Sequence, residues 1–190
     1  MAKQLEFFFD YGSPFSYLAE TQIAGIVART GASVLYKPIL LGAVFKATSN
    51  SSPIAVPAKG RYMAEDLARW AKRYGVPMKM NPHFPVNTLA MMRGAVAAQS
   101  AGRFPEYHQA MFRGMWVEGL NLSDPSVYEP IMKRFGIDPE KLRSADVKAK
   151  LQANTDEAVA RGVFGVPAFF LGQTLYWGND RLDFVEEALK

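Results

Sequence analysis

A serine at the start of a predicted helix is the first feature of this 190-residue sequence that could take part in chemistry. Ser13 lies in the segment DYGSPFSYL (10–18), between an apolar run over 5–9 that is typical of a buried strand and a predicted helix over 15–29. Backbone N–H groups at a helix N-terminus favour anions, so this position suits a bound thiolate. The alternative interpretation is that Ser13 only caps its helix.

The tripeptide Gly165-Val166-Pro167 is a second candidate, because it stands directly before a predicted strand over 168–171. A cis bond is accessible before proline, and a cis Pro167 would leave the Val166 backbone free to pair with an extended ligand. Base rates for X-Pro bonds alone favour an ordinary trans turn. The cis bond is therefore a prediction that depends on the rest of the pattern.

Two further segments offer polar groups for a small ligand. Asn179 and Asp180 stand at the start of the last predicted helix, where either can cap N–H groups or Asp180 can accept a ligand ammonium. Asn50 and Lys59 lie in a Ser- and Pro-rich stretch over 42–59, and their amide and ammonium could hold a carboxylate. For Asn50 and Lys59 the alternative interpretation is solvated surface.

The absence of cysteine limits the chemistry of the chain. The protein can form no disulfide, no thiolate metal site and no cysteine nucleophile, so any thiol chemistry needs a borrowed thiol. His83 and His108 are the only histidines, and neither has a metal-like spacing to a companion ligand. We expect neither a metal site nor a serine hydrolase, because no G-x-S-x-G elbow surrounds Ser13.

Composition and charge narrow the range of partners. The formal net charge of +4 is spread without basic runs, which favours a small anionic ligand over nucleic acid. No apolar stretch approaches the ~20 residues that span a bilayer, and the N-terminal residues lack the pattern of a signal peptide. We therefore expect no membrane association and a cytoplasmic location.

The elements that must position these side chains form two strand-containing parts around a helical middle. The first strand, the helix over 15–29 and a strand over 33–38 predict a parallel pair with a right-handed crossover. The stretch over 42–59 is predicted to be a long loop that borders a site. Further helices are predicted over 61–74, 88–101, 105–118, 125–135 and 146–161. Two strands, over 168–171 and 174–177, and a helix over 181–189 complete the chain.

These motifs together resemble a known family. S-P-F-S after the first strand and F-G-V-P late in the chain look like the thioredoxin-fold scaffold of the DsbA-like group, with serine at both cysteine positions of C-x-x-C. Within that group the chain resembles the kappa-class glutathione transferases and, more closely, the bacterial 2-hydroxychromene-2-carboxylate isomerases, which share S-P-F-S-Y-L-A. The most specific matches are 66–71 (DLARWA), 74–77 (YGVP), 164–167 (FGVP) and 177–182 (WGNDRL).

The resemblance implies the fold and its organisation. It predicts an α/β, thioredoxin-like fold with an inserted all-helical subdomain, in a single DsbA-like domain over 1–190. The thioredoxin-like parts would occupy about 1–41 and 162–190, and the helical insertion about 60–161. Disulfide exchange is excluded because both cysteines are replaced.

The resemblance also implies roles for the candidate residues. Ser13 would donate a hydrogen bond to the sulfur of glutathione, and the Val166 backbone beside a cis Pro167 would pair with its cysteinyl residue. Asn50 and Lys59 match loop positions that hold the tripeptide. Asn179 and Asp180 match the pair that binds its γ-glutamyl end. Glutathione is thus the expected cofactor, and no metal is expected.

Three functions remain open at this point. By resemblance the chain is a glutathione-dependent isomerase that interconverts 2-hydroxychromene-2-carboxylate, a small aromatic carboxylate, and trans-o-hydroxybenzylidenepyruvate by reversible thiolate addition. A kappa-class-like transferase would share every glutathione contact. A non-catalytic module could instead bind a peptide or glutathione along the proline edge. A homodimer is the family expectation, and the small residues over 90–101 could pack against a partner or within the chain.

Overall fold

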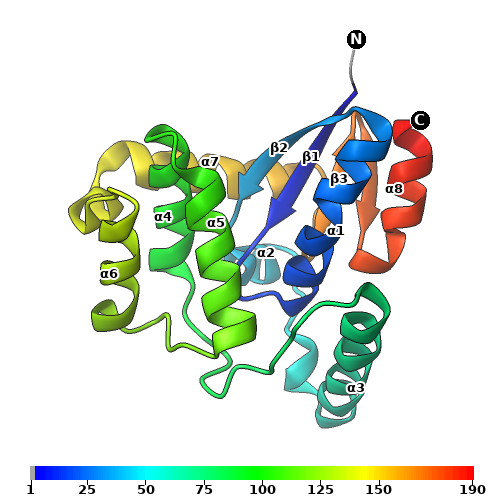
Figure 1. Ribbon diagram of the computed structural model, residues 1–190, viewed down its shortest axis with the longest axis horizontal. Helices are drawn as coiled ribbons and strands as arrows, with labels where there is room; N and C mark the ends of the chain where they lie inside the picture. Colours follow the sequence, from blue (N-terminus) through cyan, green and yellow to red (C-terminus); the bar gives the residue numbers. More distant parts are fainter. Residues whose placement is uncertain (1–2) are drawn as a thin grey trace.

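A four-stranded mixed sheet in the order β2-β1-β3-β4 lies at the centre of the computed structural model, which describes residues 3–190 (Figure 1). The strands are β1 (Gln4–Phe9), β2 (Ser33–Pro38), β3 (Ala168–Leu171) and β4 (Thr174–Trp177). β1 and β2 are parallel, whereas β3 is antiparallel to both of its neighbours. The predicted parallel pair and all four strands are confirmed.

Eight α-helices surround the sheet within the described residues. In chain order they are α1 (Pro14–Thr30), α2 (Leu41–Ala47), α3 (Pro57–Tyr74), α4 (Leu89–Ser100), α5 (Phe104–Arg113), α6 (Pro125–Arg134), α7 (Ala145–Ala160) and α8 (Leu182–Leu189). Short 3₁₀ turns lie at Pro53–Ala55, Pro139–Arg143 and Asn179–Arg181, and a wide π turn at Gly114–Glu118 follows α5.

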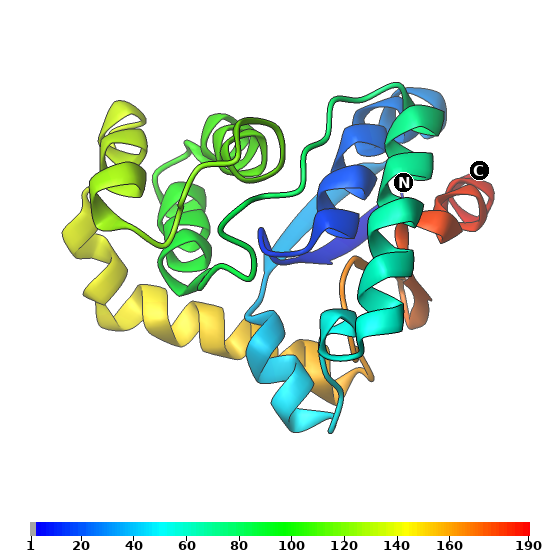
Figure 2. The same cartoon turned by 90° about the horizontal axis from the view of Figure 1, so that it is seen from below.

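Helices cover both faces of the sheet because β1 is apolar on both sides. Side chains alternate along a strand, so Phe7 and Phe9 face one layer and Phe8 the other. Phe7 stacks on Phe169, and Phe8 meets Phe170 edge-on, with ring centroids 4.8 Å and 5.6 Å apart. Figure 2 shows α1 and α3 on one side of the sheet and α7 with α2 on the other.

The helices α4 to α7 form a lobe beside the sheet, here called the helical lobe, and α7 returns the chain to the sheet (Figure 1). The small residues of α4 are buried within this chain, and Gly94 leaves no room for a Cβ beside the Tyr107 ring. The small-residue stripe is therefore used for packing inside one chain. The expected homodimer rests on the resemblance alone.

The prediction of a long loop over 42–59 is wrong. This stretch contains most of α2, a 3₁₀ turn and the first residues of α3, which begins at Pro57. α2 is stabilised by two distant contacts. Val44 is buried in the hydrophobic cluster on the Phe8 face of the sheet, and the Leu41 N–H donates a hydrogen bond to the Asp10 carboxylate. A contact across 31 residues leaves no local signal in the sequence.

Candidate functional site

A cavity of about 880 Å³ opens at the end of β1 and the start of α1. All seven residues singled out from the sequence line it: Ser13, Asn50, Lys59, Val166, Pro167, Asn179 and Asp180. They come from the start of α1, from the stretch over 50–59 and from the last 25 residues of the chain, and the fold brings them together. Whether each side chain is free to bind a ligand depends on the contacts that it makes within the protein.

Ser13 is the N-cap of α1 and is also bonded across the cavity floor. Its Oγ accepts a hydrogen bond from the Ser16 N–H and donates one to the Val166 carbonyl, both at 3.1 Å. Pro14 follows at the first helical position, where its lacking N–H costs nothing. Ser13 is buried and lines the cavity, so the residue that caps α1 also faces the space where a ligand could lie.

The bond between Val166 and Pro167 is cis, as predicted. This bend carries the chain into β3 and turns the Val166 carbonyl toward Ser13. The Trp177 ring packs against Gly165, because a Cβ at this position would lie 2.9 Å from the Trp177 Nε1. The proline loop and the start of α1 thus form one edge of the cavity.

Asn50 and Lys59 also line the cavity, and their side chains differ in the contacts they make. The Asn50 side chain donates a 2.9 Å hydrogen bond to the Phe164 carbonyl and accepts one from the Ser51 N–H, so it bridges two walls of the cavity. Lys59, in the first turn of α3, is exposed and makes no ion pair among residues 3–190. Its ammonium is available to an anionic ligand.

Asn179 and Asp180 are both engaged by side chains of this protein. Asn179 is buried, and its carbonyl accepts a 3.0 Å hydrogen bond from the Tyr74 hydroxyl. Asp180 is exposed and pairs with Arg181 at 2.7 Å. An exposed pair of this kind is weak, so a ligand ammonium can replace Arg181 at the carboxylate.

Asp10 is a cavity residue that we did not single out from the sequence. Its carboxylate lies in the cavity wall but is only 1% exposed, and it accepts hydrogen bonds from Gly12, Leu41 and Thr88. Its place directly after β1 and three residues before Ser13 was the available signal. A polar residue that ends a buried strand often faces a site.

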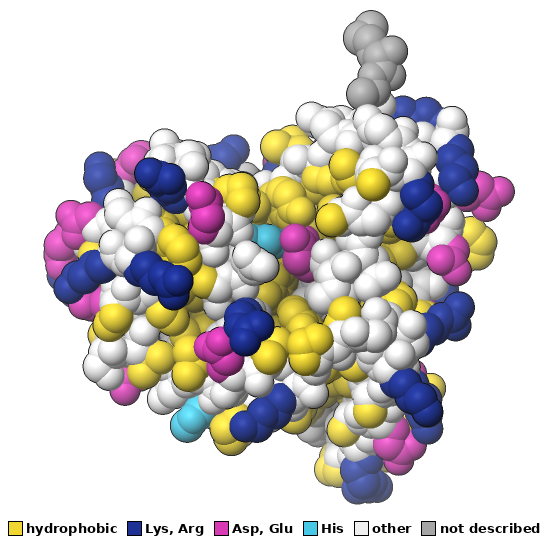
Figure 3. Space-filling view, viewed as in Figure 1, with side chains coloured by type: hydrophobic (Ala, Val, Ile, Leu, Met, Phe, Trp, Pro, Cys, Tyr) yellow, Lys and Arg dark blue, Asp and Glu magenta, His cyan; other side chains and the backbone are white. Residues whose placement is uncertain are grey.

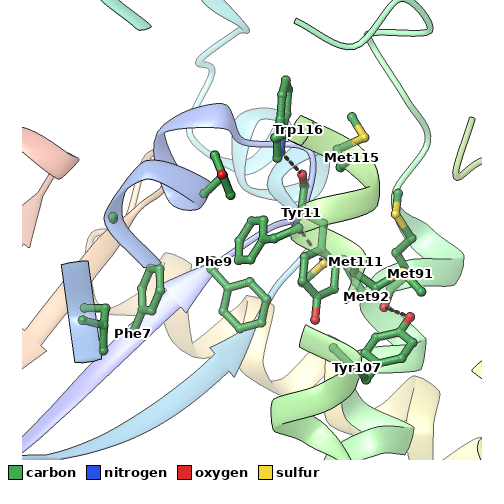
Figure 4. Close-up of a cluster of buried hydrophobic side chains, with 14 of the residues drawn as sticks. Phe7, Phe9, Tyr11, Met91, Met92, Tyr107, Met111, Met115 and Trp116 are labelled. Atoms are coloured by element: carbon green, nitrogen blue, oxygen red, sulfur yellow. Dashed lines mark hydrogen bonds between the residues drawn. The ribbon is translucent and has the colours of Figure 1, made fainter. Parts of the chain in front are cut away.

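The turn between β1 and α1 is held on its other side by the helical lobe. The Tyr11 carbonyl accepts a 2.8 Å hydrogen bond from Trp116 Nε1, which Figure 4 shows, and its N–H points at the Met92 sulfur. The Tyr11 hydroxyl lies 3.1 Å from His108 Nδ1. The segment that carries Ser13 is therefore fixed from two sides.

Aromatic and apolar side chains make up much of the remaining wall. They come from α1, α2, α3, the loop before α4, the proline loop and β4: Phe15, Phe45, Trp70, Phe84, Pro85, Val86, Phe164 and Trp177. Phe15, Phe164 and Trp177 belong to the strand-containing parts, whereas Trp70 and Phe84 belong to the segment between them.

A second cavity of about 510 Å³ lies between α1 and α5, and none of the seven residues lines it. Figure 3 shows the hollowed, largely hydrophobic face between the helical lobe and α1. His108 forms part of its floor, beside Glu20 and five aromatic rings. Neither histidine lines the larger cavity, so the contacts of a Ser-His hydrolase are missing at Ser13.

No group of three or more His, Cys, Asp or Glu side chains among residues 3–190 is arranged to hold a metal ion. No helix there is both long and apolar enough to cross a membrane.

Comparison with known proteins assigns the family. The sequence model of the DsbA-like thioredoxin domain matches residues 4–190. A 2-hydroxychromene-2-carboxylate isomerase of Sphingobium xenophagum is 32% identical over 195 residues, which covers 100% of this chain and 99% of that protein. The chain belongs to this isomerase family. It is an enzyme family within the DsbA-like thioredoxin fold, as the motifs predicted.

Two further similarities agree with this assignment. A solved 2-hydroxychromene-2-carboxylate isomerase superposes with a TM-score of 0.87 at 31% identity, over 98% of this chain and 94% of that one. The kappa 2 glutathione transferase of Caenorhabditis elegans is 28% identical and covers 99% of this chain. The predicted α/β thioredoxin-like fold with helices between its two strand-containing parts is confirmed.

Proposed function

We propose that this protein is a glutathione-dependent isomerase that interconverts 2-hydroxychromene-2-carboxylate and trans-o-hydroxybenzylidenepyruvate. The observation that carries the proposal is the meeting of Ser13, at the start of α1, with the cis Val166–Pro167 bond inside one cavity. Membership of the isomerase family supplies the substrate. The assignment of glutathione as the cofactor rests on the groups that line the cavity.

The residues of the cavity fit a tripeptide thiol. A volume of about 880 Å³ is in the range of small-molecule sites and leaves room for a bicyclic substrate beside the cofactor. The Val166 backbone offers a strand-like edge for the cysteinyl residue. Lys59 offers a free ammonium for a carboxylate, and Asp180 a carboxylate for the γ-glutamyl ammonium, with Asn50 and Asn179 beside them.

Ser13 would act on the thiol itself. A free thiol has a pKa near ~8.5, and a helix N-terminus together with a hydroxyl donor lowers it. The Ser13 hydroxyl has one proton, which now goes to the Val166 carbonyl. When glutathione binds, its cysteinyl N–H can take over that carbonyl, and Ser13 can turn its proton to the sulfur.

Bound glutathione would supply a thiolate that adds reversibly to the conjugated substrate, permits rotation about the former double bond and leaves unchanged. The protein's part is to hold the two molecules in register. Trp70, Phe84 and Phe15 offer flat apolar surface for an aromatic bicycle. Burial of Ser13 keeps water from competing for its hydroxyl.

A kappa-class-like transferase is the second candidate, favoured by the 28% identity to the Caenorhabditis elegans kappa 2 enzyme. It would use the same glutathione contacts and release the adduct instead of reversing the addition. A non-catalytic thioredoxin-fold module is a third candidate. The grouping of Ser13, Asn50, Lys59 and Asp180 in one cavity argues against it.

Absorbance-monitored isomerisation of 2-hydroxychromene-2-carboxylate, with and without glutathione, tests the proposal. Turnover that needs glutathione but does not consume it supports the isomerase. Consumption of glutathione with an electrophile and no isomerisation would favour the transferase. Glutathione binding by calorimetry without either reaction would leave the non-catalytic module.

A homodimer and a cytoplasmic location belong to the same proposal. Sedimentation equilibrium of the purified protein tests the dimer, since a single 21.1 kDa species would contradict it. Fractionation of the source cells tests the location.

A further inference from the structure

One buried carboxylate joins three walls of the cavity. Asp10 Oδ1 accepts a 2.8 Å hydrogen bond from the Gly12 N–H. Asp10 Oδ2 accepts one of 2.9 Å from the Leu41 N–H and one of 3.1 Å from the Thr88 hydroxyl. Gly12 belongs to the turn before α1, Leu41 begins α2, and Thr88 precedes α4. A single side chain thus sets the spacing of these segments.

The first wall carries Ser13. The Asp10 carbonyl accepts a 3.0 Å hydrogen bond from the Ser13 N–H, while the carboxylate holds Gly12. Gly12 has no room for a side chain, because a Cβ there would lie 2.8 Å from the Thr88 Cγ2. The direction of the Ser13 hydroxyl therefore depends on how Asp10 and Thr88 hold the turn.

The second wall carries Asn50. α2 starts at Leu41 and its N-cap residue, Leu40, supplies no side-chain cap. The Asp10 carboxylate, which lies directly after β1, caps the helix instead by accepting a hydrogen bond from the Leu41 N–H. α2 leads to the turn with Asn50, which reaches across to the Phe164 carbonyl. Both sides of the proposed glutathione position depend on Asp10.

The contacts fit an ionised Asp10. Three donors converge on two oxygens, an arrangement that stabilises the carboxylate form. Burial is the largest influence and raises the pKa of Asp10 above its ordinary value, and the hydrogen bonds from Leu41, Gly12 and Thr88 oppose that rise. Replacing one oxygen by an amide NH2 would set two donors against each other.

We propose that Asp10 is a positioning residue for the reaction, which aims the Ser13 hydroxyl by holding the turn before α1 against α2 and Thr88. The inference rests on the proposed function. Asp10 acts through Ser13, so removing Ser13 must remove the effect of changing Asp10.

A double-mutant cycle tests this dependence. Asp10→Asn and Ser13→Ala are made singly and together, and kcat, KM and the glutathione dissociation constant are measured well below each variant's melting temperature. Displacing a reacting group by about 1 Å can cost about 100-fold, so we expect Asp10→Asn to lower kcat by about 10- to 100-fold when Ser13 is present. In the Ser13→Ala background the same change should alter kcat less than about twofold.

Two further variants keep the result interpretable. Thr155→Val is the matched control, because the Thr155 hydroxyl bonds the neighbouring Leu40 N–H at 3.1 Å but does not line the cavity. It should lower the melting temperature and leave kcat unchanged. If Asp10→Asn does not fold, Thr88→Val removes one of the three contacts and should show the same dependence on Ser13 with a smaller fold-change.

The outcomes separate this inference from the proposed function. Equal fold-losses of kcat for Asp10→Asn with and without Ser13 would overturn the positioning role, as would a lower melting temperature with unchanged kcat. If the native protein shows no glutathione-dependent turnover, the proposed function itself fails. If turnover is present but Ser13→Ala leaves it unchanged, the role of Ser13 and with it the positioning role of Asp10 are overturned. Where turnover of Ser13→Ala is too slow to measure, the same cycle is read from the glutathione dissociation constants.

Discussion

The Ser13 hydroxyl donates a 3.1 Å hydrogen bond to the Val166 carbonyl, across 153 residues of sequence. This bond joins the start of α1 to the loop of the cis proline and lies in the wall of the larger cavity. A ligand with a thiol and a neighbouring N–H group would need both partners: the Ser13 hydroxyl as a donor to its sulfur and the Val166 carbonyl as an acceptor for its N–H. Under the proposed function, bound glutathione would separate this donor from its acceptor.

The Ser13 bonds predict a cost to stability when the hydroxyl is removed. Ser13→Ala deletes the cap on the Ser16 N–H and leaves the Val166 carbonyl without this donor. We expect the free energy of unfolding to fall by about 1–2 kcal/mol in a urea titration. Ser16→Ala is the control, because the buried Ser16 hydroxyl has no hydrogen-bond partner and its loss should cost little. Equal losses for the two variants would contradict the assignment.

Lys59 predicts a salt-dependent contribution to glutathione binding. It lines the cavity, is exposed and has no ion pair among the described residues, so Lys59→Met should weaken glutathione binding about two- to fivefold. Raising the salt concentration should shrink that difference, since an exposed charge is screened. Calorimetry measures both. Lys46→Met in α2, outside the cavity, should leave the affinity for glutathione unchanged. An equal loss of affinity in Lys46→Met would mean that the net charge of the protein, and not a contact at Lys59, sets the effect.

Close packing in the helical lobe predicts a strong effect at Gly94. A Cβ at this position would collide with the Tyr107 hydroxyl, which donates a 2.9 Å hydrogen bond to the Met91 carbonyl. Gly94→Ala should lower the free energy of unfolding by about 1–3 kcal/mol. Gly42→Ala is the comparison, because no atom lies within 4 Å of a Cβ there and helix α2 should gain slightly. Chemical denaturation of both variants decides it.

The ion-pair cluster at the sheet edge predicts a pH-dependent stability. Burial, the largest single influence, raises the pKa of Glu157, but the bonds and charges of Lys37 and Arg161 outweigh it and leave the pKa below its ordinary value of 4.5. A lowered folded pKa means stability that is present above 4.5 and lost as pH falls through the folded value. Glu157→Gln should melt lower than the native protein at pH 7, and the gap should close on acidification. A gap that is constant with pH would contradict this.

Much of the fold could be predicted from local sequence. The strands at 168–171 and 174–177 were placed to the residue, since apolar runs and the Gly172-Gln173 turn mark them. The prediction of a loop over 42–59 was wrong because the helix there depends on contacts that are distant in the sequence. α2 is stabilised by Asp10 and by core packing, which are distant contacts that no local pattern contains.

The candidate site shows the same division. The residue patterns and the family resemblance singled out seven residues, and all seven line one cavity. Neither showed that Asn50 is bonded to Phe164 or that Asp180 is paired with Arg181, because such contacts depend on three-dimensional packing. Asp10 was missed because its partners, Leu41 and Thr88, are 31 and 78 residues away.

Ultraviolet titration of the bound thiol measures whether Ser13 stabilises the thiolate of glutathione, as the proposed function requires. The absorbance of the glutathione complex is followed against pH for the native protein, Ser13→Ala and Ser16→Ala. We expect the pKa of the bound thiol to lie below the ~8.5 of a free thiol in the native protein and in Ser16→Ala. It should rise toward the free value in Ser13→Ala. An equal thiol pKa in all three proteins would contradict the account.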